Sequence, residues 1–358
     1  MKRITFVVVI LASALLLASC ASAPPKPEER VAPTPASAPA SAPAVEAAPE
    51  PVPASEAWRA TPPRAGALPK LVIPTIQQAT LPNGLTVLVS EQHQLPFISV
   101  QAAFRAGAAL DPENQPGLAN LVYEMLPEGT GKRDAVALAD AFGDLGSRLG
   151  EFVGDDGGGL HFAVLSRNLD PAVGLLAEVV QRPRFDAKDF ERRQKKVLAD
   201  LVRSLGDPMY LAFDAAGGEI FGATHPYGHS TGGTMASVKA LKVEDVKRFY
   251  AANVGPRTAA LVFAGDITLQ QARKLAQKHF GKWKGKARPP QAPAAPAAEP
   301  RSRVVVVAKP GLEQTVLAAG RPGIARGDGD EWPLELATSV FGGMFTSRLN
   351  MNLREDKG

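Results

Sequence analysis

Metal binding is the first chemistry that the histidines of this chain suggest, because imidazole is a common protein ligand for transition metals. Of the five histidines, only His225 and His229 have the four-residue spacing that places two ligands on one helix face. Pro226 and Gly228 lie between them and exclude a regular helix there. The other three are isolated in the sequence: His93, His161 and His279. We therefore predict structural or surface roles for all five.

A second candidate is the stretch GLANLVYEML, residues 117–126, whose apolar residues have the spacing of an amphipathic helix. Its polar members are Asn120, Tyr123 and Glu124, and it contains no histidine. A hydrolytic zinc helix needs two histidines on one face, with a carboxylate nearby that takes a proton from the metal-bound water. The stretch has the apolar pattern of such a helix without its metal ligands.

The bulk composition is that of an ordinary globular chain without a strongly charged surface. The 358 residues are enough for one large or two medium domains, and the formal net charge is only +4. No basic block alternates with aromatic residues, so the sequence does not indicate nucleic-acid binding. The densest charge run, ERRQKK at residues 191–196, lies on a helical pattern and is predicted to form a solvated face.

The first 20 residues, MKRITFVVVILASALLLASC, predict a secretory signal peptide from their basic start, apolar core and small-residue end. The apolar run is too short to span a bilayer comfortably. Its end, LASC, resembles a bacterial lipobox, which implies cleavage before Cys20 and lipid attachment to it. Cys20 is the only cysteine, so no disulfide is expected within the chain. By analogy with enteric lipoproteins, Ala21 in place of Asp favours the outer membrane, facing the periplasm.

Two Pro/Ala-rich stretches divide the rest of the chain. Residues 21–70 predict a disordered tether, and residues 286–302 predict an interdomain linker. Residues 71–285 are expected to form the first domain. Residues 303–358 begin in the same style, with two strand runs and then a helix from about Asp330. We interpret them as the truncated start of a structural repeat.

Within the first domain, the hydrophobic pattern alternates between strand and helix periods. Strands are predicted on both sides of the turn PNG within 77–92, at 97–107, as a hairpin within 147–166, and at 258–266. Helices are predicted at 117–126, 134–146, 169–182, 187–205, 209–221, 242–252 and 268–281. This order predicts an α+β fold, in which helices pack on one side of a mainly antiparallel sheet.

Several stretches, in order, resemble the M16 family of zinc peptidases, the insulinase and mitochondrial processing peptidase group. They are LPNGLTVLV, AAFRAGAALDPENQPGLANLVYEML, GTGKRDAVALADAFGDLGSRL, HPYGHSTGGTMASVKALKVEDVKRFY, NVGPRTAALVFAGDI and FGGMFTSRLNMNLREDKG. The resemblance covers about residues 72–358. It implies an M16-like repeat, with one complete domain and the start of a second.

Active members of that family carry His-x-x-Glu-His on the first helix and a more distant Glu, which together bind and use Zn²⁺. At the matching positions this sequence has Asn120, Tyr123, Glu124 and Asp200. An Asn amide is a poor zinc ligand beside imidazole. A tyrosine with a pKa near its usual value of about 10 is a poor general base at neutral pH. We therefore expect no catalytic residue, metal or cofactor in this chain, with the zinc in a partner subunit.

Two interpretations of the altered positions remain. Asn120, Glu124 and Asp200 offer oxygen atoms that suit a hard cation such as Ca²⁺ or Mg²⁺. The alternative, which we favour, is an amphipathic helix whose polar residues face an empty cleft. Its apolar residues would then pack inward: Leu118, Leu121, Val122 and Met125.

The resemblance also implies a role for the second segment. Arg354, in LREDKG, matches an Arg that acts with a later Tyr to orient the substrate carbonyl in a partner domain's active site. That Tyr would fall beyond residue 358. Some bacterial members divide the enzyme between a zinc-bearing chain and a chain that supplies this Arg/Tyr pair. We therefore predict a lipid-anchored, non-catalytic subunit that binds peptide substrate, with Ser147 to Val153 as the candidate edge strand.

Two alternatives stay open at this point. The chain could be a peptide-binding or scaffold lipoprotein of the cell envelope that takes part in no proteolysis. It could also be a metallopeptidase that is active with an altered metal site. An unusual enzyme of that kind would cleave peptide alone and lose activity on Glu124→Gln.

Overall fold

The computed structural model describes residues 66–67, 70, 73–296 and 302–357. The predicted signal peptide, Cys20 and almost all of the predicted tether lie outside the described residues, as do residues 297–301 of the predicted linker. The described residues from Ile73 to Lys357 group into one unit. Among the helices of the described ranges, none is both long and apolar enough to cross a bilayer.

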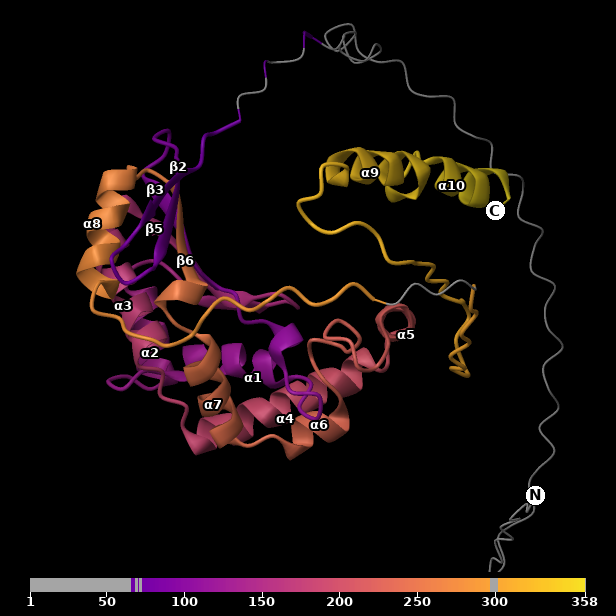
Figure 1. Ribbon diagram of the computed structural model, residues 1–358, viewed down its shortest axis with the longest axis horizontal. Helices are drawn as coiled ribbons and strands as arrows, with labels where there is room; N and C mark the ends of the chain where they lie inside the picture. Colours follow the sequence, from indigo (N-terminus) through magenta and orange to yellow (C-terminus); the bar gives the residue numbers. More distant parts are fainter. Residues whose placement is uncertain (1–65, 68–69, 71–72, 297–301, 358) are drawn as a thin grey trace, which may run out of the picture. The chain divides into compact units, whose positions relative to one another are not determined.

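A six-stranded sheet forms the centre of the fold (Figure 1). Its strands are β1 (Gln77–Thr80), β2 (Thr86–Glu91), β3 (Phe97–Phe104), β4 (Gly150–Val153), β5 (Gly158–Leu165) and β6 (Ala259–Gly265). They lie in the order β1-β2-β6-β3-β5-β4. All neighbours are antiparallel except β2 and β6, because the chain returns through the helices before β6 inserts between β2 and β3. The predicted α+β class is confirmed.

The turn between β1 and β2 shows why the PNG signal predicts a hairpin. Gly84 has φ +92°, a conformation that glycine adopts without the steric penalty of a side chain. A Cβ there would lie 2.8 Å from Cγ of Arg257. Asn83 Nδ2 donates to the carbonyl oxygens of Phe280 at 2.9 Å and Trp283 at 3.2 Å. The turn is therefore fastened to the end of the last helix of this domain.

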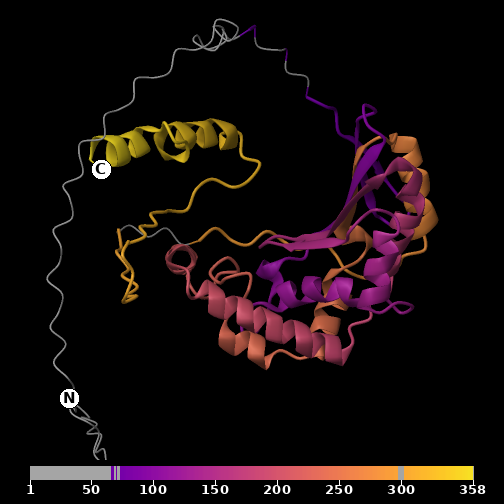
Figure 2. The same ribbon diagram turned by 180° about the vertical axis from the view of Figure 1, so that it is seen from behind.

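One face of the sheet carries most of the core. Along β3, Ile98, Val100, Ala102 and Phe104 are buried, while the residues between them are partly or fully exposed. This period-two pattern places alternate side chains on opposite faces. Helices α3 (Leu169–Gln181) and α8 (Leu269–Phe280) lie along the sheet as predicted (Figure 2).

The remaining helices of the first domain are α1 (Leu118–Met125), α2 (Ala135–Gly143), α4 (Ala187–Ser204), α5 (Pro208–Phe221), α6 (Met235–Ala240) and α7 (Val243–Asn253). Helix α1 packs against both α4 and α7, and it also contacts β4 and β5. Helix α6 packs against α4. The sequence predicted all of these helices except α6. That helix has only six residues and begins at a capping box between Thr234 and Ser237.

The segment from residue 302 onward departs from the prediction. A helix is present, α9 (Glu331–Thr338), followed by the short helix α10 (Arg348–Asn350). The two predicted strand runs between residues 303 and 325 are not strands, so this prediction is wrong. Val304 and Leu317 are each 90% exposed. A strand is stable only when another strand satisfies its backbone groups, and neither run is paired in the described part of the chain.

A polar contact ties the β2–β3 connection to the end of β6. His93 Nδ1 lies 2.8 Å from Asp266 Oδ1, and Ser166 Oγ donates to Asp266 Oδ2 at 2.9 Å. The hydrogen bond to Asp266 raises the pKa of His93 above its ordinary value, and this effect outweighs the opposing effect of desolvation. The same contact lowers the pKa of Asp266.

We expect Asp266→Asn to lower the pKa of His93 toward the reference value of about 6.5, as measured by NMR titration of the imidazole. The folded-state pKa of His93 is raised. While Asp266 stays ionised, protonated His93 therefore stabilises the fold fully below about pH 6.5, and this contribution is lost as the pH rises through the folded pKa of His93. Asp140→Asn, at an exposed position of α2, should leave the pKa of His93 unchanged. Equal His93 pKa values in the two variants would contradict the assignment.

Candidate functional site

Helix α1 begins at a glycine because of its close neighbours and its backbone. Gly117 has φ +91°, and a Cβ at this position would lie 2.8 Å from the carbonyl oxygen of Gly232. The carboxylate of Asp111 accepts the N–H groups of Gly117 and Ala119, both at 2.7 Å, and so satisfies free donors of the first turn. Burial raises the pKa of Asp111 to about 6, although these N–H groups oppose the shift.

Tyr123 does not face the cleft, which corrects the expectation that all polar residues of this helix do. Its side chain is 1% exposed, and its hydroxyl donates to the carbonyl oxygen of Ala106 at 2.6 Å. The ring stacks on Phe104 with centroids 6.3 Å apart. Burial raises the pKa of Tyr123 well above its ordinary range. The residue at the family's general-base position is therefore a core tyrosine that keeps its proton.

Asn120 and Glu124 lie on another face of α1 and line a small pocket. Asp200 of α4 lines the same pocket, so the structure brings three of the four motif positions together. The pocket has a volume of about 290 Å³. Its other lining residues are Val197, Leu201, Ser204, Tyr210, Ser230, Thr231 and Gly232. Hydroxyl groups and carboxylates therefore surround the position that corresponds, by the resemblance to M16, to the metal site of active members.

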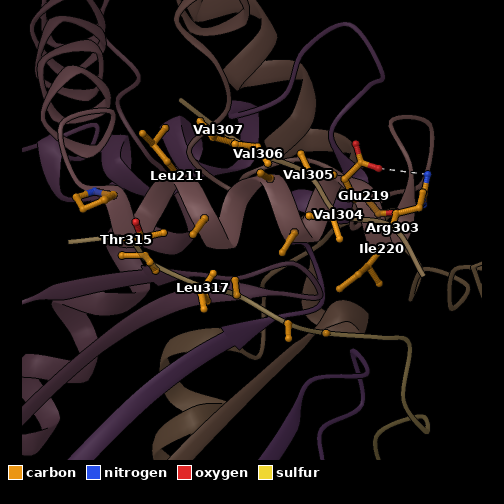
Figure 3. A pocket seen from close by; sticks show the side chains of 18 of the residues that line it. Leu211, Glu219, Ile220, Arg303, Val304, Val305, Val306, Val307, Thr315 and Leu317 are labelled. Carbon is orange, nitrogen blue, oxygen red and sulfur yellow. Dashed lines mark hydrogen bonds and ion pairs between the residues drawn. The ribbon is translucent and has the colours of Figure 1, made fainter. Parts of the chain in front are cut away.

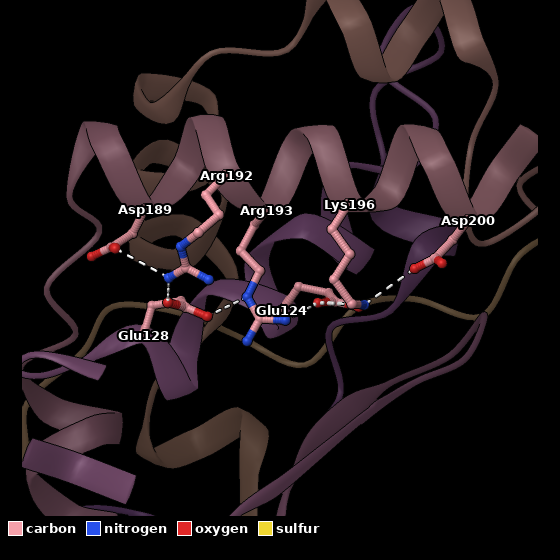
Figure 4. A network of polar contacts seen from close by, with 7 residues as sticks. All are labelled: Glu124, Glu128, Asp189, Arg192, Arg193, Lys196 and Asp200. Carbon is pink, nitrogen blue, oxygen red and sulfur yellow. Dashed lines mark hydrogen bonds and ion pairs between the residues drawn. The ribbon is translucent and has the colours of Figure 1, made fainter. Parts of the chain in front are cut away.

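Basic side chains of α4 form ion pairs with the carboxylates of this site (Figure 4). Arg193 Nη1 donates to Glu124 Oε2 at 2.9 Å. Lys196 Nζ lies 3.2 Å from Glu124 Oε1 and 3.2 Å from Asp200 Oδ2. Arg203 Nη1 lies 3.1 Å from the other oxygen of Asp200. The cleft expected to be empty is therefore crossed by ion pairs between α1 and α4.

Glu128, directly after α1, extends the network. Its side chain is 3% exposed, and its two oxygens accept hydrogen bonds from Arg192 and Arg193. The side chain of Arg193 is only 18% exposed. The prediction that residues 191–196 form a solvated face is therefore wrong for Arg193, and Arg192 and Lys196 are also paired at their charged ends.

The donor set does not fit zinc. Asn120 offers an amide, Tyr123 points into the core, and the Glu124 carboxylate is already neutralised by two cations. Among the described residues, no group of three or more His, Cys, Asp and Glu side chains is arranged to hold a metal ion. Zinc sites instead use imidazole, thiolate or free carboxylate ligands in tetrahedral geometry.

Glu151 brings the edge strand β4 to the border of this site. Burial raises the pKa of Glu151, and the negative charge of Glu124 adds to the shift, while Arg193 and Lys196 oppose it. Sequence reasoning missed Glu151, Glu128, Arg193 and Lys196 as members of the site. One signal was available, because Lys196 and Asp200 are four residues apart on a predicted helix, the spacing of a helical ion pair.

The histidines take structural positions. His279 Nε2 lies 2.6 Å from Asp170, and the His225 ring stacks on Phe221 with centroids 5.1 Å apart. His225 Nδ1 also accepts the backbone N–H of Tyr227 at 3.0 Å. Within the described ranges, no histidine lines the pocket formed by Asn120, Glu124 and Asp200.

Arg354 lies in the helical turn Met351–Asp356. Its guanidinium carbon is 4.4 Å from the centre of the Phe345 ring, and its Nε is 3.7 Å from Glu355 Oε1. The side chain is 59% exposed and so accessible to a ligand. Its role in substrate orientation stays a prediction.

A larger cavity of about 1150 Å³ lies between α5 and residues 302–322 (Figure 3). Apolar side chains dominate its labelled lining, among them Leu211, Ile220, Val306 and Leu317. Arg303 crosses its end and pairs with Glu219 at 3.2 Å. The residues at the family's metal-ligand positions line the smaller pocket and not this cavity, so we place the candidate site at α1 and α4.

Two family models match the chain. Residues 86–205 match the model described as insulinase (peptidase family M16), and residues 240–358 match the model described as peptidase M16 inactive domain. An uncharacterized zinc protease of Mycobacterium leprae is 27% identical over 286 residues, which are 78% of this chain and 63% of that protein. The non-peptidase homolog YmxG of Helicobacter pylori is 30% identical over 199 residues, 56% of this chain and 45% of that protein. The chain thus spans less than two thirds of the length of these relatives.

Solved structures show the same architecture. A peptidase M16 inactive domain from Pseudomonas fluorescens has a TM-score of 0.68 at 27% identity, covering 79% of this chain and 68% of that chain. A protease from Helicobacter pylori has a TM-score of 0.72 at 19% identity, covering 80% of this chain and 69% of that one. The second likeness concerns the fold alone.

The network at Glu128 generates a stability prediction. Glu128→Ala should lower the free energy of unfolding by about 3 kcal/mol, because it leaves the partly buried Arg193 without its buried partner. Glu191→Ala, at an exposed position of the same helix α4, should change it by less than about 0.5 kcal/mol. Urea denaturation of the two variants measures the difference. Equal unfolding free energies would show that the ion pairs of Glu128 with Arg192 and Arg193 do not stabilise the fold.

Proposed function

The chain belongs to the M16 peptidase family, and from this premise we propose that it is a non-catalytic subunit that binds peptide and pairs with a zinc-bearing M16 chain. The proposal rests mainly on which residues stand at the metal-ligand positions of α1. The helix keeps its place beside the edge of the sheet, while its metal-ligand positions are occupied by Asn120 and by a Glu124 that is paired with cations. A match to an inactive-domain model and the likeness to a non-peptidase homolog support this view.

Peptide binding is supported by the edge of the sheet. Strand β4 is the last strand in the order, so one of its sides has no neighbouring strand within the described sheet. Peptides commonly bind such an edge by adding a strand through main-chain hydrogen bonds. Glu151 of β4 reaches the border of the α1–α4 site. A peptide added to β4 would therefore pass along the altered site.

The register shows which backbone groups of β4 are available. The N–H of Gly154 donates to the carbonyl oxygen of Gly157 at 2.8 Å, so these two residues form a hydrogen-bonded pair. Val153 lies opposite Gly158, the next pair along the ladder. Antiparallel ladders alternate between hydrogen-bonded and non-hydrogen-bonded pairs. The N–H of Val153 thus points away from β5 and can donate to an added strand.

We propose for Arg354 the role that the family resemblance implies. Its guanidinium carries several donors in a planar fork, which can hold a peptide carbonyl in a fixed direction. The site that it serves would be the zinc centre of the partner chain. The pairing, the substrate and this role of Arg354 together form the proposal.

The same proposal includes the location of the protein in the cell. The signal pattern and the lipobox resemblance at Cys20 support a lipid-anchored protein of the cell envelope, in the outer membrane and facing the periplasm. The Pro/Ala-rich residues 21–70 would hold the folded part away from the membrane.

The test compares peptide hydrolysis by two preparations of the full-length protein, each with and without EDTA. One is recombinant protein alone, and the other is tagged protein purified from its native membrane together with bound partners. We expect hydrolysis only in the native preparation and its loss with the chelator, because the zinc belongs to the partner.

The other outcomes are equally informative. Chelator-sensitive hydrolysis by the recombinant chain alone would show that the altered helix is catalytic. No hydrolysis in either preparation would contradict the subunit proposal and favour a peptide-binding lipoprotein without proteolysis.

The edge-strand proposal has its own prediction. Val153→Pro removes an outward N–H while leaving the β4–β5 hydrogen bonds in place, and proline is tolerated on edge strands. It should weaken binding of a fluorescein-labelled casein digest about tenfold, as measured by fluorescence anisotropy. Val153→Ala shortens the same side chain and keeps the N–H, so it should bind like the wild type. Equal binding by both variants would exclude β4 as the peptide site.

A further inference from the structure

The position of Lys196 between two carboxylates has a consequence for metal binding. Its ammonium nitrogen lies 3.2 Å from Glu124 Oε1 and 3.2 Å from Asp200 Oδ2. These carboxylates come from different helices, α1 and α4. They stand at the positions where active M16 members place the second histidine and the distant glutamate. A single positive charge therefore bridges two of the three ligand positions of the family's metal.

We infer that the Lys196 ammonium takes the place of a metal ion in this chain and keeps divalent cations out of the oxygen set formed by Asn120, Glu124 and Asp200. The inference rests on the α1–α4 geometry and on the family motif. It does not depend on the proposed pairing with a zinc-bearing chain.

The charges around the bridge support this assignment. Glu124 is held from two directions, by Lys196 and by Arg193 at 2.9 Å. Asp200 is held by Lys196 and, on its other oxygen, by Arg203 at 3.1 Å. The side chain of Arg203 is 80% exposed, so solvent screens its contribution strongly. Lys196 is thus the one of these cations that contacts both carboxylates.

The Lys196 ammonium remains charged in this setting. Its partial burial opposes the charge, but hydrogen bonds and the negative charges of Glu124 and Asp200 outweigh that effect and raise the pKa of Lys196. A divalent cation would have to displace it to reach both carboxylates. Without Lys196, the remaining oxygen atoms are hard ligands of the kind that Ca²⁺ and Mn²⁺ prefer.

The test uses Mn²⁺ as the probe, because free Mn²⁺ is measured directly by electron paramagnetic resonance. Lys196→Met removes the ammonium and keeps most of the side-chain volume. We expect this variant to bind Mn²⁺ at least about tenfold more tightly than the wild type, because Glu124 Oε1 and Asp200 Oδ2 then lose the cation that joins them. Its melting temperature should rise with added Mn²⁺, while that of the wild type should not.

Lys195→Met is the matched control, since it makes the same charge change at the adjacent, exposed position of α4. It should bind Mn²⁺ no more tightly than the wild type. The double variant Lys196→Met/Glu124→Gln should lose the gained binding, which would assign it to this oxygen set. Lys196→Gln provides a second, more polar replacement in case the methionine variant does not fold.

Two results would overturn the inference. One is wild-type Mn²⁺ binding as tight as that of the folded Lys196→Met or Lys196→Gln variant. The other is equal gains in the Lys195 and Lys196 variants, which would show a general charge effect. Because these readouts need neither peptide nor partner, they are independent of the hydrolysis test.

Discussion

The structure around α1 depends on the neutralisation of carboxylates at the contact between α1 and α4. Glu124 of α1 and Glu128, directly after α1, both face α4, and Glu128 is almost fully buried. Buried or crowded carboxylates are costly unless cations and hydrogen bonds compensate them. Arg192, Arg193 and Lys196 provide that compensation from α4. Where an M16 peptidase uses a metal ion, this chain uses its own side chains.

The rest of the fold is compatible with the loss of the metal. The core of the sheet lies under α3 and α8, and Tyr123 adds to it through Phe104 and the carbonyl of Ala106. The M16 scaffold and its edge strand β4 are therefore retained around an α1 whose general-base position holds a buried, protonated tyrosine, which is compatible with the proposed helper role.

The sequence was sufficient for elements whose signal is local. Alternating residues identified β3, the PNG turn identified the β1–β2 hairpin, and apolar periodicity identified the helices of eight or more residues in the first domain. The sequence was insufficient for contacts between side chains that are far apart along the chain. The contacts of Glu124 with Arg193 and Lys196 span 69 and 72 residues. The burial of Tyr123 depends on its contact with Phe104, which is distant in the sequence. Whether the apolar runs after residue 302 form strands depends on strand partners, which an alternating pattern does not reveal.

The most direct test of the central claim is the zinc content of the purified full-length chain. The protein would be expressed in zinc-supplemented medium, purified without chelator, and analysed by inductively coupled plasma mass spectrometry. The account predicts zinc far below one ion per chain, together with a melting temperature that EDTA does not change. One zinc per chain, lost with EDTA together with stability, would contradict it, because the metal and not the α4 cations would then hold the site.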